Sequence, residues 1–266
     1  MIDLKQELTR LEKNGLYRKM RLLESEQAVR VKIDGKEVIN FCSIDYLGLA
    51  ADNRLKQAAK QAIDRYGVGS GASRLVCGNM YLHQKLEDKL AEFKNSESCL
   101  VFSSGYMANL GIISAIASKD CLILSDKLNH ASIVDGILLS RARFKRYAHC
   151  DTRALEKMLQ QAGGYKDKLI VTDSVFSMDA DIAPLKEIAQ LADKYAALLM
   201  IDEAHATGVL GEHGRGAAEY CAVEERIAIQ MGTLSKACGT FGAYVCGASE
   251  LTQFLLNKSR PFIYTT

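Results

Sequence analysis

A lysine in a glycine-rich loop is the strongest chemical signal in the sequence. Lys236 lies in the stretch MGTLSKACGTFG, residues 231–242, directly after an apolar segment and between small residues. Close backbone walls keep such a lysine from reaching solvent, and burial lowers the pKa of an amine so that it can attack a carbonyl carbon. The hydroxyls of Thr233 and Ser235 could contact a phosphate from the same turn. A P-loop has its second glycine directly before the lysine, so this order disfavours a nucleotide phosphate site.

A carboxylate and an imidazole follow a second apolar segment. The residues Leu198–Ile201 lead directly into Asp202, and His205 comes three positions later. An aspartate at the end of a strand commonly caps a helix or joins an ion pair, whereas an aspartate and a histidine together at a buried strand end also suit a functional site. Metal ligation is the weaker alternative, because no third ligand with a recognisable spacing follows.

Two more turns after apolar segments carry groups that could bind a ligand. At Gly105 and Tyr106 an apolar strand turns into a helix, whose free N–H groups could face an anion while the tyrosine offers an aromatic face. An ordinary strand-to-helix turn is the alternative at this place. His130 follows another strand, and it could stack on a flat ligand or cap the next helix.

The elements that must position these groups alternate along the chain. An N-terminal helix over Leu4–Leu11 and a hairpin around Asp34 and Gly35 form a first segment, residues 1–45. After it, amphipathic helices alternate with seven short buried strands, expected at Cys99–Ser103, Cys121–Ser125, Phe144–Tyr147, Leu169–Thr172, Ala197–Ile201, Ile227–Met231 and Tyr244–Gly247. This rhythm predicts an α/β fold with a mostly parallel sheet covered by helices on both faces, a three-layer αβα arrangement. Ligands of such sheets bind beyond the carboxyl ends of the strands, where the residues above lie.

Composition excludes several classes of function. The chain of 266 residues has 34 Lys and Arg against 32 Asp and Glu, a net charge of +2, so no electrostatic surface for nucleic acid or an acidic membrane is expected. No apolar run approaches the roughly 18 residues of a membrane span. Eight cysteines lie scattered without a CxxC pair, which predicts buried free thiols and a reducing cytoplasm.

Taken together, the candidate groups match the needs of one cofactor, pyridoxal phosphate. It requires a lysine for its aldehyde, a carboxylate for its ring nitrogen, hydroxyls and a helix N-terminus for its phosphate, and an imidazole for its ring face. Six stretches of the sequence also resemble the α-oxoamine synthases, pyridoxal-phosphate enzymes of fold type I: GSGASRLVCGN, FSSGYMANLG, SDKLNHASIVDG, TDSVFSMDADIAPL, IDEAHATGVLGEHGRG and TLSKACGTFGAYVCG. One departure is Ile44, which stands where the family usually has a polar residue.

The resemblance implies a role for each candidate residue. Lys236 would hold the cofactor and act as the catalytic base, and Asp202 would pair with the pyridine nitrogen. The other residues carried over by the resemblance are His205 near the phenolic oxygen, His130 on the ring, Gly105 and Tyr106 along the phosphate and ring pocket, Ser177 as a nearby hydrogen-bonding group, Thr233 at the phosphate and Arg18 near the acyl substrate. No metal is expected.

The resemblance also implies an activity and an assembly. The closest members condense L-alanine with pimeloyl-CoA, or with its acyl-carrier-protein (ACP) equivalent, and release CO2 in biotin biosynthesis. A glycine C-acetyltransferase, a serine palmitoyltransferase, a plain aminotransferase and a non-catalytic chain are the alternatives. Family members are homodimers, with a large catalytic domain, here 46–266, followed by a C-terminal small domain that this sequence is expected to lack.

Overall fold

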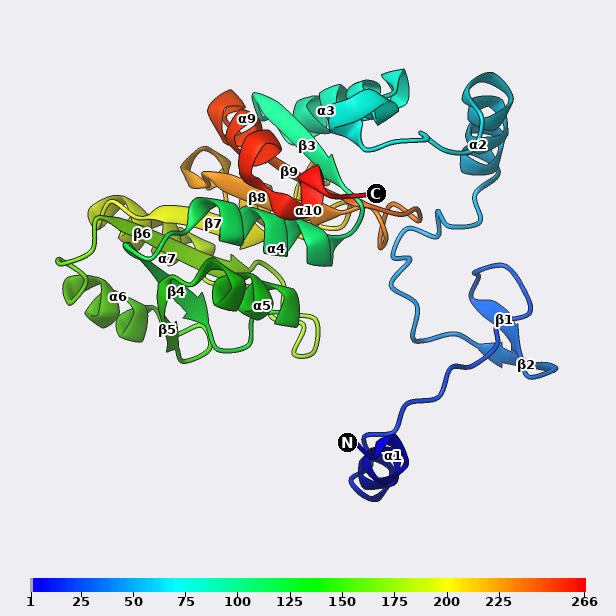
Figure 1. The fold of residues 1–266 in the computed structure, drawn as a ribbon, viewed down its shortest axis with the longest axis horizontal. Helices are drawn as coiled ribbons and strands as arrows, with labels where there is room; N and C mark the ends of the chain where they lie inside the picture. Colours follow the sequence, from blue (N-terminus) through cyan, green and yellow to red (C-terminus); the bar gives the residue numbers. More distant parts are fainter. Residues whose placement is uncertain (1) are drawn as a thin grey trace. The chain divides into compact units, whose positions relative to one another are not determined.

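The computed structural model describes residues 2–266, and the chain divides into two compact units (Figure 1). One unit runs up to Ser43 and the other spans Ile44–Thr266. The domain roles expected from the sequence, for residues 1–45 and 46–266, stay predictions.

The smaller unit is a helix followed by a hairpin. Its elements are α1 (Leu4–Lys13), β1 (Arg30–Ile33) and β2 (Lys36–Ile39). The strands pair in antiparallel fashion, with Val31 opposite Val38. Asp34 and Gly35 both have positive φ, 49° and 76°, which is the backbone that a two-residue hairpin turn requires. The expected hairpin is therefore confirmed.

The larger unit is built on a seven-stranded sheet in the order β3-β9-β8-β7-β6-β4-β5. The strands are β3 (Ser98–Phe102), β4 (Cys121–Asp126), β5 (Arg143–Tyr147), β6 (Asp167–Asp173), β7 (Leu198–Asp202), β8 (Ile229–Thr233) and β9 (Ala243–Gly247). The neighbours from β8 to β5 pair in parallel, whereas β9 is antiparallel to both β8 and β3. The expected mostly parallel sheet is confirmed.

Helices cover both faces of this sheet (Figure 1). The helices of the larger unit are α2 (Asn53–Tyr66), α3 (Tyr81–Phe93), α4 (Gly105–Ile116), α5 (Ala131–Ser140), α6 (Thr152–Gln160), α7 (Leu185–Lys194), α8 (Ala217–Tyr220), α9 (Ser249–Lys258) and α10 (Arg260–Ile263), with short turns η1 (Arg74–Gly78) and η2 (Glu224–Arg226), and α2 has no buried residue. Within residues 2–266, none of the helices has both the length and the apolar character that a membrane crossing needs.

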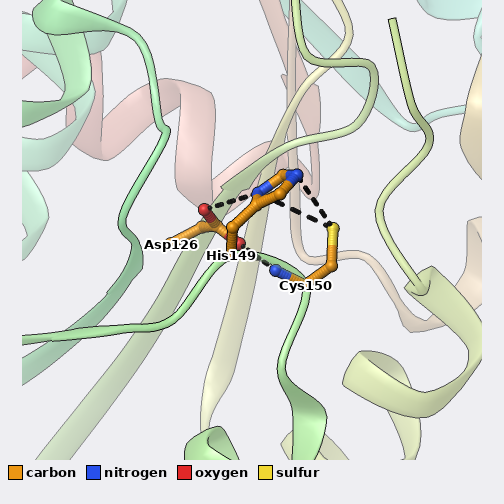
Figure 2. A group of neighbouring side chains, drawn as sticks. All are labelled: Asp126, His149 and Cys150. Carbon is orange, nitrogen blue, oxygen red and sulfur yellow. Dashed lines mark hydrogen bonds and ion pairs between the residues drawn. The ribbon is translucent and has the colours of Figure 1, made fainter. Parts of the chain in front are cut away.

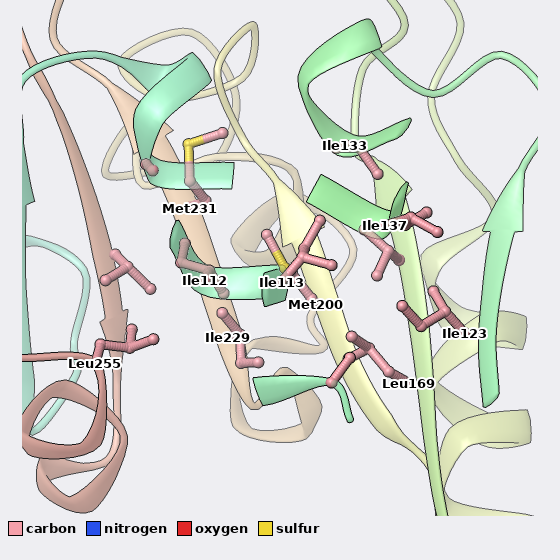
Figure 3. Close-up of a cluster of buried hydrophobic side chains, with 14 of the residues drawn as sticks. Ile112, Ile113, Ile123, Ile133, Ile137, Leu169, Met200, Ile229, Met231 and Leu255 are labelled. Atoms are coloured by element: carbon pink, nitrogen blue, oxygen red, sulfur yellow. The ribbon is translucent and has the colours of Figure 1, made fainter. Parts of the chain in front are cut away.

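Successive side chains of the strands pack alternately into two separate hydrophobic cores, one on each face of the sheet. On β4, Ile123 packs in one core and Leu124 in the other, and on β7 Met200 and Ile201 are divided in the same way. The first core lies against α4, α5 and α9, as Figure 3 shows for Ile113 and its neighbours. Successive strand residues point to opposite faces, so a sheet with two buried faces needs continuous apolar runs. These runs are the reason that the strands were recognisable in the sequence.

The loop that carries Lys236 connects two antiparallel strands. Strand β8 starts at Ile229 and continues to Thr233, so the expected strand Ile227–Met231 is wrong by two residues at each end. Ile227 instead follows the short turn η2. The loop closes through Leu234 N–H to the Gly242 carbonyl, at 2.9 Å. Thr233 therefore ends a strand and Lys236 lies in a hairpin loop.

The cysteines are free, as expected, but their burial differs from the expectation. Cys99, Cys121 and Cys246 are buried, whereas Cys42 and Cys77 are exposed. The prediction of buried thiols is therefore wrong for those two. Both lie outside the sheet and the helices that cover it, so they do not pack in the hydrophobic cores.

A buried ion pair lies next to the candidate site residues of β7. Lys94 and Glu203 have fully buried side chains, with Lys94 Nζ 4.0 Å from Glu203 Oε2. Lys94 also donates to the Arg215 carbonyl, and Glu203 accepts from the N–H groups that open α8, at Ala217 and Ala218, each at 2.9 Å. Burial raises the pKa of Glu203, and the charge of Lys94 opposes that rise.

We expect Lys94→Met to lower the free energy of unfolding by about 3–5 kcal/mol, because it leaves the Glu203 carboxylate buried without its cation. Urea denaturation followed by circular dichroism measures the change. Lys89→Met is the matched control, since Lys89 pairs with Glu92 in solvent, where its side chain is 67% exposed. Equal stability of the two variants would contradict the role given to the buried pair.

Candidate active site

A cavity of about 270 Å³ lies beyond the carboxyl ends of the central strands. It is lined by all but one of the residues singled out from the sequence: Gly105, Tyr106, His130, Ser177, Asp202, His205, Thr233 and Lys236. The exception is Arg18, which belongs to the smaller unit, so its role stays a prediction. The sheet thus brings together groups from five separate stretches of the chain.

Lys236 is held in place by its glycine-rich loop. Gly239 has a φ of +63°, and a Cβ at this position would lie 2.3 Å from the Ala50 backbone nitrogen. Only glycine allows both that conformation and that close approach. The Asp45 carboxylate fixes the opposing segment by accepting from Leu49 and Ala50 N–H. Close packing of Gly239 against the backbone at Ala50 therefore fixes the loop three residues after the lysine.

The amine of Lys236 ends a chain of polar contacts. Its Nζ lies 3.0 Å from His205 Nε2, and His205 Nδ1 lies 2.7 Å from the hydroxyl of Tyr46. Burial lowers the pKa of Lys236, although the charges of Asp202 and Asp173 oppose this. Burial, together with the charges of Lys236 and His130, lowers the pKa of His205 to about 4. At neutral pH the histidine is therefore uncharged, and a larger fraction of the lysine is a free amine than in water.

We expect Tyr46→Phe to slow the covalent attachment of pyridoxal phosphate to Lys236 by about 2- to 10-fold, the worth of one hydrogen bond. Without the hydroxyl, His205 Nδ1 loses the hydrogen bond that helps to fix which ring nitrogen carries the proton. Stopped-flow absorbance measures the rate, and ¹⁵N NMR of the histidine reports the tautomer. Tyr220→Phe, at an exposed tyrosine outside the cavity, is the control. An unchanged tautomer and rate would show that Tyr46 plays no such part.

Asp202 anchors a network of buried polar groups. Its Oδ2 accepts from Asn109 Nδ2 at 2.8 Å, and the same amide nitrogen lies 2.9 Å from Ser132 Oγ. Ser132 Oγ in turn lies 2.7 Å from His130 Nδ1. Asp173, opposite Asp202 in the sheet, accepts from the His130 N–H at 2.8 Å. This network fixes the imidazole against the cavity.

Burial makes the charged forms of the neighbouring Asp202 and Asp173 carboxylates unfavourable. Burial raises the pKa of Asp202, and hydrogen bonds from Asn109 and Ala204 oppose the rise. Burial and the charge of Asp202 raise the pKa of Asp173 well above its ordinary value. A cation placed in the cavity beside Asp202 would relieve this unfavourable burial of negative charge.

Another part of the cavity lining offers donors to an anion. Helix α4 begins at Gly105, and its cap Ser104 accepts from Met107 N–H at 3.3 Å. The first N–H groups of a helix have no partner within the helix and carry partial positive charge. Hydroxyls of Thr233 and Ser235, 2.7 Å apart, face the same cavity. This part of the lining can hold a phosphate.

Both readings left open for His130 describe real features of the structure. Its side chain caps α5 by accepting from Ser132 N–H, at 3.2 Å, and its ring also lines the cavity. Tyr106 lines the cavity too, and its hydroxyl donates to Asp135 on α5 at 2.5 Å. The aromatic side chain is thereby tied to a neighbouring helix.

Sequence reasoning missed four polar residues of the site: Tyr46, Asn109, Ser132 and Asp173. Asp173 ends an apolar strand, as Asp202 does, and this signal could have identified it. Asn109 and Ser132 lie inside helices, where an isolated polar residue gives no comparable signal.

Comparison with known proteins gives the family. Residues 36–266 match the model of the family described as aminotransferase class I and II. The chain belongs to this family. It is 56% identical over 262 residues to an 8-amino-7-oxononanoate synthase of Geotalea daltonii, covering 98% of this chain and 67% of the relative. A synthase of the same name from Geobacter sulfurreducens is 55% identical, with 98% and 66% covered. The chain thus spans about two thirds of the length of these relatives.

Solved structures agree with this membership. A serine palmitoyltransferase from S. paucimobilis with a bound PLP–myriocin aldimine matches with a TM-score of 0.91 and 34% identity over 97% of this chain and 66% of that one. An 8-amino-7-oxononanoate synthase of Francisella tularensis matches with a TM-score of 0.73 and 37% identity, over 86% and 64%. The expected α-oxoamine synthase resemblance, fold and enzyme class are confirmed.

The residues of the cavity fit pyridoxal phosphate. Asp202 is a buried carboxylate that would gain a partner in a protonated ring nitrogen, and Lys236 presents an amine with a lowered pKa. The buried carbonyl oxygen Oδ1 of Asn109, beside Asp202, has no hydrogen-bond partner. A buried acceptor without a partner at this place is a second sign that a donor belongs there.

Proposed function

We propose that this chain carries the catalytic centre of an 8-amino-7-oxononanoate synthase. In that reaction L-alanine and a pimeloyl thioester of CoA or ACP give 8-amino-7-oxononanoate, CO2 and the free thiol carrier. The observation that carries the proposal is the cavity in which Lys236 Nζ lies 3.0 Å from His205 Nε2 and which the buried Asp202 also lines. The names of relatives at 56% and 55% identity support the choice of substrates.

Each residue of the cavity has a task in this reaction. Pyridoxal phosphate, when bound, supplies a protonated ring that takes up the electron pair left on the α-carbon of the amino acid. Asp202 keeps the proton on the ring nitrogen through its negative charge. Lys236 would hold the cofactor covalently through Nζ, and its free amine would serve as the base that removes the α-proton.

The remaining groups orient the Lys236 amine and hold the ring and phosphate of the cofactor. His205, neutral at pH 7, shares a hydrogen bond with the reacting amine of Lys236 and so fixes its position. His130 lines the cavity and would lie on the ring face, and Tyr106 and Ser177 line the same cavity. Thr233 and the N-terminus of α4 at Gly105 would hold the phosphate.

Substrate choice is tested by presenting L-alanine, glycine and L-serine in turn. Exchange of the α-proton in D2O, followed by NMR, reports which amino acid the site activates. Release of CO2 on addition of pimeloyl, acetyl or palmitoyl thioesters then reports the acyl partner. Preference for serine with a palmitoyl thioester would favour the serine palmitoyltransferase activity named for the structural neighbours. Exchange of the α-proton without CO2 release for any of the thioesters would instead favour an aminotransferase reaction.

Assembly and location form part of the same proposal. We place the protein in the cytoplasm, since its cysteines are free, as a reducing compartment keeps them. We propose a homodimer on the strength of the family resemblance, and small-molecule substrates as the remaining partners. Light scattering of the purified protein tests the dimer.

A further inference from the structure

A histidine outside the cavity connects two of the segments that line it. His149 follows β5, and its ring lies among Asp126, Asp181, Cys150 and Phe176 (Figure 2 shows the first and third of these). None of the functional roles assigned above uses it. Its side chain is 24% exposed, so most of the ring is held within the protein.

Both ring nitrogens of His149 meet carboxylates. Nδ1 lies 3.0 Å from Asp126 Oδ1, and Nε2 lies 2.7 Å from Asp181 Oδ2. The Phe176 ring contacts the imidazole edge-on, with centroids 4.4 Å apart. Only the protonated imidazole donates from both nitrogens, so this arrangement selects the charged form.

The first carboxylate fixes the segment that leads to His130. Asp126 ends β4, and its Oδ1 also accepts from Leu128 N–H at 2.8 Å, while Oδ2 accepts from Cys150 N–H at 2.8 Å. Asn129, the residue after Leu128, donates from Nδ2 to Ser125 Oγ and to the Val171 carbonyl. The position of the imidazole that lines the cavity therefore depends on this short turn.

The second carboxylate belongs to the segment that carries Ser177. Residues 174–183 form a narrow loop closed by a bridge between Val175 and Ile182. Within it, the carbonyl of Asp181 accepts from Phe176 N–H at 3.0 Å. Ser177, next to Phe176, lines the cavity. His149 thus bonds across from the His130 segment to the Ser177 segment.

The same cluster has the atom types of a metal site, because ligand atoms of Asp126, His149 and Cys150 lie within 4.8 Å of one another. The contacts favour a hydrogen-bond network instead. Both imidazole nitrogens already face carboxylates, and burial with the charges of Asp126 and Asp181 raises the pKa of the Cys150 thiol to about 12. A protonated thiol is a poor metal ligand.

We propose that His149 is a positioning residue of the cofactor site, which holds the His130 segment and the Ser177 segment together by bonding Asp126 and Asp181 at once. The proposal rests on the proposed function only in taking pyridoxal phosphate as the ligand of the cavity. The link itself is a property of the folded chain, so it can be measured without the cofactor.

The link depends on pH in a defined direction. Burial lowers the pKa of His149, but the hydrogen bonds to Asp126 and Asp181 outweigh it, and the pKa is raised overall. The titratable groups that contact the ring are those two carboxylates and the Cys150 thiol. A raised folded-state pKa means that the link is at full strength below the ordinary pKa of histidine and is lost as pH rises through the folded-state pKa.

The test compares His149→Gln with the wild-type chain, because glutamine keeps a polar side chain but cannot donate as a cation to both carboxylates. We expect the variant to bind pyridoxal phosphate about tenfold more weakly in a fluorescence titration, the worth of one charged hydrogen bond. Its affinity should also lack the decline that the wild-type protein shows above the pKa of His149. Amide hydrogen exchange of residues 126–130 and 174–183, measured without cofactor, should become about tenfold faster.

Two further variants keep the test decisive. His213→Gln removes an exposed histidine that pairs with Glu219 at 2.6 Å, and it should match the wild type in every measurement. Asp181→Asn, at a half-exposed carboxylate, breaks one arm of the link and should lower the pKa of His149 seen by NMR, even where His149→Gln fails to fold. Unchanged hydrogen exchange in both segments, or a wild-type pKa of His149 in Asp181→Asn, would overturn the proposal. A wild-type chain that binds no pyridoxal phosphate would refute the proposed function, while hydrogen exchange would still decide the role of His149.

Discussion

Lys236→Ala should abolish covalent attachment of pyridoxal phosphate and reduce α-proton exchange of L-alanine by at least about 10³-fold. Removal of a positioned general base alone costs about 10²- to 10⁴-fold. The same substitution also removes the amine that binds the cofactor. Lys236 is suited to both tasks because burial lowers its pKa and because its Nζ lies beside a neutral His205.

The measurement is direct. Borohydride reduction of the wild-type protein with pyridoxal phosphate, followed by peptide mass spectrometry, should place the label on Lys236. Lys119→Ala, at an exposed lysine, should keep both the label and the exchange rate. A label on another lysine in the wild-type protein would contradict the assignment.

Asp202→Asn should keep the shape of the site but lower α-proton exchange by about 10²- to 10⁴-fold. Leaving a buried charge without its partner costs about 3–5 kcal/mol, and each 1.36 kcal/mol is tenfold in rate. The asparagine oxygen can still accept from Asn109, although its amide nitrogen then replaces the oxygen that accepts from Ala204 N–H at 2.9 Å. It carries no charge to keep the ring nitrogen protonated, and the electron pair on the α-carbon then loses its acceptor.

Kinetics separate this loss from a loss of folding or binding. The affinity for pyridoxal phosphate should fall much less than the exchange rate, and the circular dichroism spectrum should match the wild type. Asp193→Asn is the control, since Asp193 pairs with Arg226 at the surface, where ion pairs contribute little. Near-normal exchange in Asp202→Asn would show that this carboxylate does not support the electron sink.

The core of the site could be predicted because each of its main residues follows an apolar strand. Asp202 follows Met200 and Ile201, and Lys236 follows β8 within a loop of small residues. A strand buried on both faces is visible in the sequence as a continuous apolar run, and the ligands of such sheets bind at the strand ends. The sequence alone was therefore sufficient for the α/β sheet, the cofactor class and the residues at the ends of the strands.

Tertiary structure decided which distant residues meet there. Tyr46 reaches His205 across 159 positions of sequence, and Asn109 reaches Asp202 across 93. His149 bridges Asp126 and Asp181, which lie on different segments around the cavity. No periodic pattern encodes such contacts, because they arise from strand order and loop packing, and both depend on the whole sheet. The sequence determined which groups could do the chemistry, and the fold determined which partners orient them, because hydrogen bonds depend on distances of about 3 Å that only the packed chain sets.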